Sequence, residues 1–233
     1  MSDLGVLFRK ELHATFTSPI GYTVGVVFLL VLGYTFSLTL FVTRVANLTY
    51  IFHQMYVLSI LLVPVVTMRA FAEERRTDTL ELLLTAPVHE VWIVLAKFLA
   101  ALVLVLALYA AAATYALILG LYGEPDWGPI YGGYLAVSLL ACLLVAVGLY
   151  WSSLTENQVV AAAASLGTFL MLWFADSMSY LLPSPLDVVL VNLSLIGHFT
   201  PLATGSVFFS DAAYYLTIAL LALFLTTRRL TER

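Results

Sequence analysis

Charged residues are scarce in this sequence, and their scarcity excludes an ordinary water-soluble fold. Only 10% of the 233 residues are charged and 62% are hydrophobic, and the mean hydropathy is +1.01. A soluble domain carries about 25% charged residues, because its surface must face water. The surplus apolar surface of this chain must meet lipid, so an integral membrane protein is predicted. No basic stripe is present that could bind nucleic acid.

Several kinds of chemical site are excluded by missing residues. Cys142 is the single cysteine, so neither an intrachain disulfide nor a thiolate cluster can form, and its apolar surroundings favour a buried thiol. A phosphate-binding loop ends in Gly-Lys-Ser or Gly-Lys-Thr, but Lys10 and Lys97 follow Arg9 and Ala96. The four histidines are scattered without a His-Glu-x-x-His motif, and no Gly-x-Ser-x-Gly occurs. We therefore expect no catalytic residue, metal or directly bound cofactor in this chain.

Six apolar stretches approach or exceed the length of about 20 residues that a transmembrane helix needs. They cover approximately residues 20–42, 51–70, 91–119, 130–154, 158–182 and 211–227. The strip 188–196 is too short to cross and is expected to lie in the outer interface. The predicted fold class is thus all-α with six transmembrane helices. We find no internal repeat or linker, so residues 1–233 are expected to form a single membrane domain.

The basic residues predict the orientation of the spans. With an even number of spans, nine of the ten lysines and arginines fall on one side and only Arg44 lies opposite. Because cytoplasmic loops carry the excess of Lys and Arg, both termini and the long loop after the second span are predicted to be cytoplasmic.

Residues 1–18 have the periodicity of an amphipathic helix. Leu4, Leu7 and Leu12 fall on one half, and Lys10 and His13 lie opposite. Such a helix is expected to lie in the plane of the inner interface and to end at the Ser-Pro pair that follows. The alternative is a simple basic anchor before the first span.

Residues 68–87 hold the densest charge in the sequence. Glu73 and Arg76 have i,i+3 spacing and are expected to pair on a helix that leaves the membrane. Thr77 or Asp78 is expected to cap a second, short helix, with Asp78 and Glu81 at the spacing of a capping box. The leucines of that helix need a cover, which is either the protein's own bundle or a groove on a soluble partner. The charged rim around the leucines favours the partner.

Three other polar features are less specific indicators of function. Ser152 and the residues up to 159 form a polar turn, in which Thr155 or Asn157 is expected to cap the next helix. Lys97, about two turns into the third span, is expected to extend its ammonium to the inner face. Asp176, in the outer third of the fifth span, is either a pathway residue or an interfacial acid.

The same segments resemble a known family. Residues 8–22, 64–74 and 79–88 are similar to permeases of the type-2 ABC transporter class, and more narrowly to the gliding-motility permease family. Residues 152–158, together with His198-Phe199 through Tyr214-Tyr215, extend the resemblance over nearly the whole chain.

The resemblance implies a permease of the bacterial plasma (inner) membrane, with an N-terminal in-plane helix and a cytoplasmic coupling helix. That helix would dock into a separate ATPase subunit, which would bind the ATP and Mg²⁺, and a second permease copy would complete the assembly. The residues that would contact the ATPase are Glu73, Glu74, Arg75, Arg76, Thr79, Leu80, Glu81, Leu82, Leu83 and Leu84, together with Thr155, Glu156, Asn157 and Gln158.

Two other functions are weighed against an ATP-driven exporter. A membrane anchor that uses a partner ATPase for assembly or motility is plausible, because gliding machinery uses such proteins. A membrane-embedded enzyme would need a cluster of polar residues at one depth, and Asp176 alone does not supply one.

Overall fold

The computed structural model describes residues 3–43, 48–85, 88–123, 125–181 and 183–232. In these ranges the chain forms α-helices and no strand. The bounds of the long helices are α2 Pro19–Thr43, α3 Thr49–Thr67, α6 Glu90–Tyr122, α7 Trp127–Leu154, α8 Gln158–Ser179 and α11 Phe209–Thr231. The shorter helices are α1 Asp3–Thr17, α4 Arg69–Arg76, α5 Thr79–Leu84, α9 Leu186–Leu193 and α10 Leu195–Ala203.

Six segments are long and apolar enough to cross a membrane. Five are the helices α2, α6, α7, α8 and α11, and the sixth runs through α3 and α4 from Thr49 to Arg76. The prediction of an all-α protein with six spans is therefore confirmed. The apolar strip before the last span forms α9 and α10, which are bent by 52° relative to each other.

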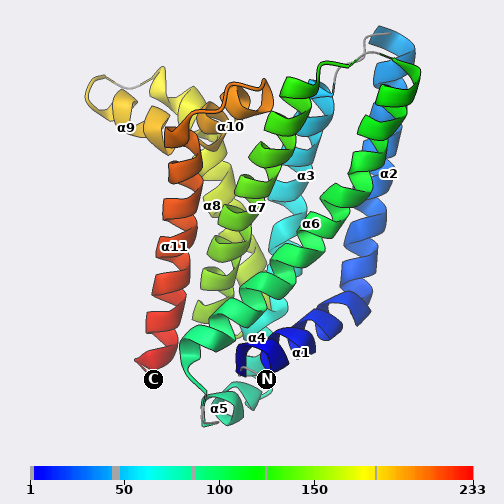
Figure 1. Ribbon diagram of the computed structural model, residues 1–233. Coiled ribbons are helices and arrows are strands. Elements are labelled where there is room, and N and C mark those ends of the chain that lie inside the picture. Colours follow the sequence, from blue (N-terminus) through cyan, green and yellow to red (C-terminus); the bar gives the residue numbers. More distant parts are fainter. Residues whose placement is uncertain (1–2, 44–47, 86–87, 124, 182, 233) are drawn as a thin grey trace.

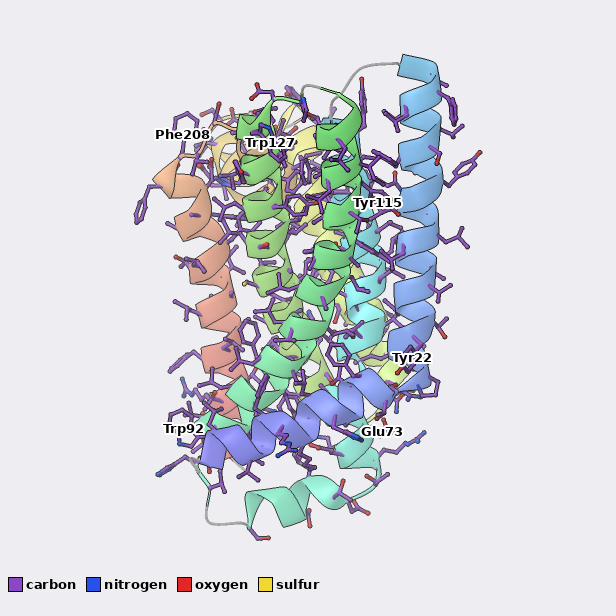
Figure 2. All side chains as sticks on the ribbon, turned by 45° about the vertical axis from the view of Figure 1, so that its right-hand side comes forward. Tyr22, Glu73, Trp92, Tyr115, Trp127 and Phe208 are labelled. Carbon is purple, nitrogen blue, oxygen red and sulfur yellow. The ribbon has the colours of Figure 1, made fainter. Side chains whose placement is uncertain are left out.

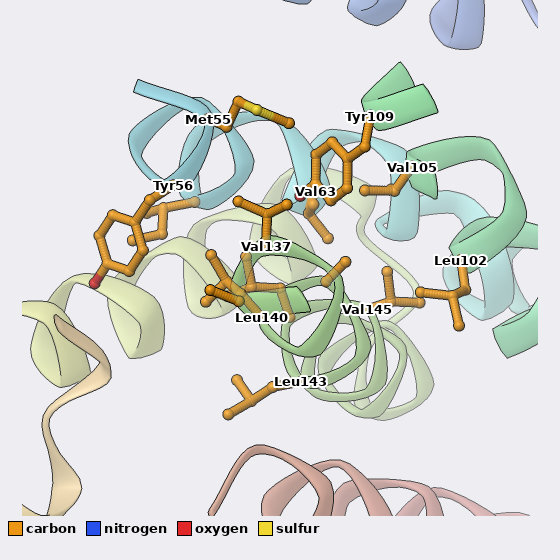
Figure 3. Packing of buried hydrophobic residues seen from close by; sticks show 14 of the residues in the cluster. Met55, Tyr56, Val63, Leu102, Val105, Tyr109, Val137, Leu140, Leu143 and Val145 are labelled. Carbon is orange, nitrogen blue, oxygen red and sulfur yellow. The ribbon is translucent and has the colours of Figure 1, made fainter. Parts of the chain in front are cut away.

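Helix α7 lies at the centre of the bundle. In its most apolar window 78% of the residues are buried, compared with 28% for α2 and α11 and 22% for α8. It packs against α3, α6, α8, α10 and α11. Figure 3 shows Val137, Leu140 and Val145 of α7 among side chains of α3 and α6, including Val63 and Leu102. The other spans thus surround α7 and keep large apolar faces for lipid.

Glycines let α3 approach α7 closely. A Cβ atom at Gly133 would overlap the ring of Phe52, and a Cβ atom at Gly148 would overlap the side chain of Thr67. Because these positions lack side chains, the two helix backbones can pack more closely than larger residues would allow. The α3–α7 pair is therefore a closely packed part of the frame that positions α4.

Both ends of the chain lie at the same end of the bundle, which we name the inner end (Figure 1). Helices α4 and α5 and the turn between α7 and α8 also lie there, whereas α9 and α10 lie at the opposite, outer end. Helix α1 crosses the inner end and packs against α6. Figure 2 shows it running between Trp92 and Tyr22, with Glu73 below it.

The break between α1 and α2 falls at Ser18-Pro19, as the sequence predicts. Leu7 and Leu12 of α1 are half-buried, and Lys10 and His13 are exposed, so the helix has the predicted two sides. The half-buried side also carries Glu11, which turns toward α6. The placement of α1 in a membrane interface stays a prediction.

Candidate functional site

The junction at which α4 begins is hydrogen-bonded to a hydroxyl group of α7. The Oγ of Ser152 accepts hydrogen bonds from the backbone N–H groups of Phe71 and Ala72, at 3.0 and 3.1 Å. The same hydroxyl donates to the carbonyl of Met68 at 2.9 Å. Three backbone groups at the α3–α4 junction are thus satisfied by one side chain of another helix. Ser152 therefore fixes the direction in which α4 leaves the bundle.

The junction between α4 and α5 is built differently from the predicted capping box. Asp78 occupies the N-cap position with φ of 55°, in the left-handed region, and its side chain makes no capping hydrogen bond. The turn is held instead by Thr77, whose hydroxyl donates to the carbonyl of Glu73 at 2.9 Å, and by Thr79, whose hydroxyl donates to the carbonyl of Glu74 at 3.3 Å. The predicted helix exists, but the predicted capping box is wrong.

The predicted contact residues of α4 and α5 divide into an outward and an inward set. Arg76, Thr79 and Glu81 are exposed and Glu73 is half-buried. Leu80 is only 3% exposed and belongs to the hydrophobic core, so it is not available as a surface leucine in this structure. The other inward residues are Glu74 and Arg75. The side chains of Leu82, Leu83 and Leu84 lie outside the described part of the structure.

The ion pair expected between Glu73 and Arg76 does not form. Glu73 faces Arg69 instead, with Oε2 3.9 Å from Nε, at i,i+4 spacing. Both side chains are more than 40% exposed, so this pair contributes little to stability. Arg76 consequently keeps its guanidinium at the exposed surface of α4.

The polar turn between α7 and α8 meets the end of α4. Asn157 is the N-cap of α8 and accepts from the backbone N–H of Val159 at 2.9 Å. This resolves the choice between Asn157 and Thr155, whose hydroxyl oxygen accepts from the N–H of Asn157. A pocket of about 380 Å³ is lined by Arg76, Glu156, Asn157, Gln158 and Val159. The structure thus brings together the two segments that sequence reasoning selected separately.

A cluster of three charges, which we name the ion cluster, joins α1, α4 and α6. Lys97 of α6 places its Nζ 2.7 Å from Glu74 Oε1 and 3.2 Å from Glu11 Oε2. The ammonium also lies 5.3 Å from the ring centre of Phe71. The Lys97 side chain is 3% exposed, so its ammonium is enclosed by protein, and its position relative to the inner membrane face stays a prediction. Sequence reasoning missed this cluster, because Glu11 is 86 residues away along the chain.

A larger pocket of about 510 Å³ opens beside the ion cluster. Glu11, Glu73 and Glu74 line it together with Arg69 and Lys97. Its remaining wall is formed by the α1–α2 corner and by apolar residues of α3 and α6. Residues of α4 thus line both this pocket and the pocket beside the α7–α8 turn.

The polar residues of the outer end are far from this site. Asp176 lies half-buried near the end of α8. On α10, Nδ1 of His198 is 2.8 Å from Oδ1 of Asp211, and the ring stacks on Tyr214 with centroids 4.2 Å apart. These contacts fasten the outer hairpin of α9 and α10 to the start of α11. Within the described residues, no three His, Cys, Asp or Glu side chains are grouped so that they could hold a metal ion.

The comparisons with known proteins concern the part of the chain that carries this site. No curated protein matches the sequence. The family model described as ABC-2 family transporter protein matches residues 45–192, which is more than half of the chain and includes α4, α5, Lys97 and the α7–α8 turn. The narrower similarity to gliding-motility permeases stays a prediction. With six candidate spans and this match, the chain belongs to the ABC-2 transporter family and is a membrane-spanning permease component of an ABC transporter.

Proposed function

We propose that this chain is the permease subunit of an ATP-driven exporter of the bacterial plasma membrane, and that it takes its motive force from a separate ATPase subunit. The observation that carries the proposal is the convergence of α4, α5 and the α7–α8 turn at one end of the bundle. Exposed Arg76 and Glu156 line the same hollow between them. A partner that docks there would contact both connections at once.

The basic residues of the inner end support its proposed cytoplasmic location. Arg76, Arg228 and Arg229 lie at this end, as do Arg9 and Lys10 of α1. The excess of Lys and Arg on the cytoplasmic side of membrane proteins supports this orientation. It places the proposed docking surface where an ATPase has access to ATP and Mg²⁺.

A second permease copy completes the proposed transporter. Only 22% of the most apolar window of α8 and 28% of that of α2 are buried within one chain. These faces have room for lipid and for a partner of the same kind, and a pathway between two copies would be enclosed by about twelve spans. The apolar spans favour a lipid-like or amphipathic substrate over an ion.

Charge reversal tests the docking surface directly. The changes Arg76→Glu and Glu156→Lys, made singly, are expected to weaken co-purification with the ATP-binding-cassette ATPase that is co-expressed with the chain. The Lys10→Glu change is the control, because it also reverses an exposed charge at the inner end but lies on α1. Unchanged co-purification of both docking variants would show that the partner binds elsewhere.

The leucines of α5 provide a second test. Replacement of Leu82 and Leu83 by Asp is expected to abolish association with the ATPase and to leave membrane insertion intact, because the two changes lie outside the spans. Insertion is measured by membrane fractionation and association by co-purification. A complex that survives both changes would remove α5 from the interface.

Flux measurements separate an exporter from a membrane anchor. The purified complex in vesicles is supplied with ATP and with a fluorescent phospholipid as the transport probe. ATP-dependent movement of the probe between leaflets supports export of an amphipathic substrate. ATP hydrolysis without movement of this or other amphipathic probes favours an anchor that uses the ATPase for assembly or motility.

A further inference from the structure

The ion cluster joins three separate helices. One ammonium group, on Lys97 of α6, contacts carboxylates of Glu11 on α1 and of Glu74 on α4. These contacts span 86 and 23 residues of sequence. No other ion pair in the described part of the chain joins α1 to the rest of the bundle. The cluster is therefore a charged attachment through which movement can pass between α4 and α1.

The placement of Lys97 is not that of a lysine that merely anchors a span. A lysine near the end of a membrane helix normally lays its aliphatic stem along apolar surface and leaves its ammonium in water. Here the ammonium is enclosed by Glu11, Glu74 and the Phe71 ring, and 3% of the Lys97 side chain is exposed. Burial of charge is costly, and a buried ion pair often stabilises a fold no better than apolar residues would. A role in setting the relative position of helices accounts for this cost.

Helix α4 lies between the proposed docking surface and the ion cluster. The exposed Arg76 of α4 lines the pocket beside the α7–α8 turn, and the less exposed Glu74 binds Lys97. Glu11 lies six residues before Thr17, the last residue of α1, and α2 begins at Pro19 after the corner. A displacement of α4 would therefore reach α1 through Lys97 and then α2 through the corner.

We propose that Lys97 is a positioning residue that transmits ATPase-driven movement of α4 to α1, by holding Glu74 and Glu11 at the same time. Helix α1 is then a driven lever of the transporter rather than a passive anchor. The inference rests on the proposed function, because it requires an ATPase that acts on α4 and α5.

The test follows α1 and α4 separately in the complete complex. Cys142 is replaced by Ala, and a single cysteine is then placed at the exposed positions His13 of α1 or Thr77 after α4. An environment-sensitive fluorophore on each cysteine reports the response to ATP with Mg²⁺ in lipid nanodiscs. The test variant is Glu11→Met, which removes the α1 carboxylate and leaves the Lys97–Glu74 pair. Thr17→Ala, in the last turn of α1, is the matched control.

Both reporters are expected to respond to ATP in the otherwise unchanged complex and in the Thr17→Ala control. In Glu11→Met the Thr77 reporter should still respond and the His13 reporter should lose its response, while the ATPase continues to co-purify. Glu11→Gln, which keeps an oxygen acceptor for Lys97, should restore part of the His13 signal. A full His13 response in Glu11→Met would overturn the proposal for Lys97 and leave the proposed function standing.

Two further outcomes are distinguishable. If neither reporter responds to ATP in the unchanged complex, or if no ATPase is bound, the proposed function is overturned and this inference with it. If Glu11→Met does not fold, the same measurement is made with Glu11, Lys97 and Glu74 all changed to Met, since apolar replacement of a whole buried ion cluster is tolerated better than removal of one member. In that variant a retained His13 response refutes the link, and a lost His13 response supports it when the Thr77 reporter still responds and the ATPase still co-purifies.

Discussion

Replacement of Ser152 by Ala should destabilise the junction between α3 and α4. The Ser152 hydroxyl is fully buried and has three partners in that junction, the N–H groups of Phe71 and Ala72 and the carbonyl of Met68. A buried donor left without an acceptor costs about 1–3 kcal/mol, and a lost hydrogen bond costs about 1 kcal/mol. With both N–H groups taken at the lower limit, the expected loss is about 3 kcal/mol.

The neighbouring serine supplies a matched control. Ser153 is equally buried, but its hydroxyl donates only to the carbonyl of Tyr150 in its own helix, at 2.7 Å. Ser153→Ala therefore loses one local bond and gains a residue that favours helix, and these effects nearly cancel. In a chain of this size 1 kcal/mol corresponds to about 2–4 °C in Tm, so Ser152→Ala should lower Tm by about 6–12 °C and Ser153→Ala should leave it almost unchanged.

The assay is thermal unfolding of the purified chain in one detergent, followed by circular dichroism at 222 nm and by loss of monodisperse protein. Equal Tm values for the two variants would refute the reasoning. They would mean that the N–H groups of Phe71 and Ala72 find acceptors within their own helix once the hydroxyl is removed.

Two further changes probe the frame around the site. Gly148→Val in α7 places a side chain against Thr67 of α3, where the two Cβ atoms would lie only 2.9 Å apart. The protein should therefore lose about 1–3 kcal/mol of stability, measured by thermal unfolding. Gly167→Val in α8 is the control, because no atom lies within 4 Å of a Cβ there, and similar losses for both variants would contradict the close α3–α7 approach. At the outer end, Tyr214→Phe removes the 2.6 Å bond to the carbonyl of Leu193 and should increase proteolysis of the outer hairpin, with no effect on association with the ATPase. Proteolysis at the unchanged rate would show that this bond does not hold the hairpin.

The sequence predicted the spans well because hydrophobic length is a strong local signal. The second predicted span, 51–70, is followed by the charged helix that the sequence predicts, which is α4 and ends at Arg76. The two helices predicted after this span form as α4 and α5, but the pair predicted between Glu73 and Arg76 does not form. Glu73 turned to Arg69 rather than Arg76, because i,i+3 and i,i+4 partners of similar reach competed for the same carboxylate.

The contacts that hold the candidate site together could not be predicted from the sequence. Ser152 reads as one residue of a polar turn, and only the packing of α7 against the α3–α4 junction reveals its three partners. Lys97 reads as a lysine two turns from a helix end, a position typical of an exposed ammonium. Its burial depends on Glu11, and nothing in the local pattern of either residue indicates that α1 folds back onto α6.

The two attachments of α4 differ in stiffness, and this difference indicates where movement goes. Ser152 binds backbone groups of α4 through a short side chain on α7, the most buried helix of the bundle. Hydrogen bonds of that kind depend on direction, so they keep the start of α4 fixed. The ion cluster uses the long, flexible stem of Lys97, whose three donors can follow carboxylates that shift. Because α2 is far less buried than α7, a force on α5 should pivot α4 about Ser152 and displace α1 and α2, while α7 stays in place.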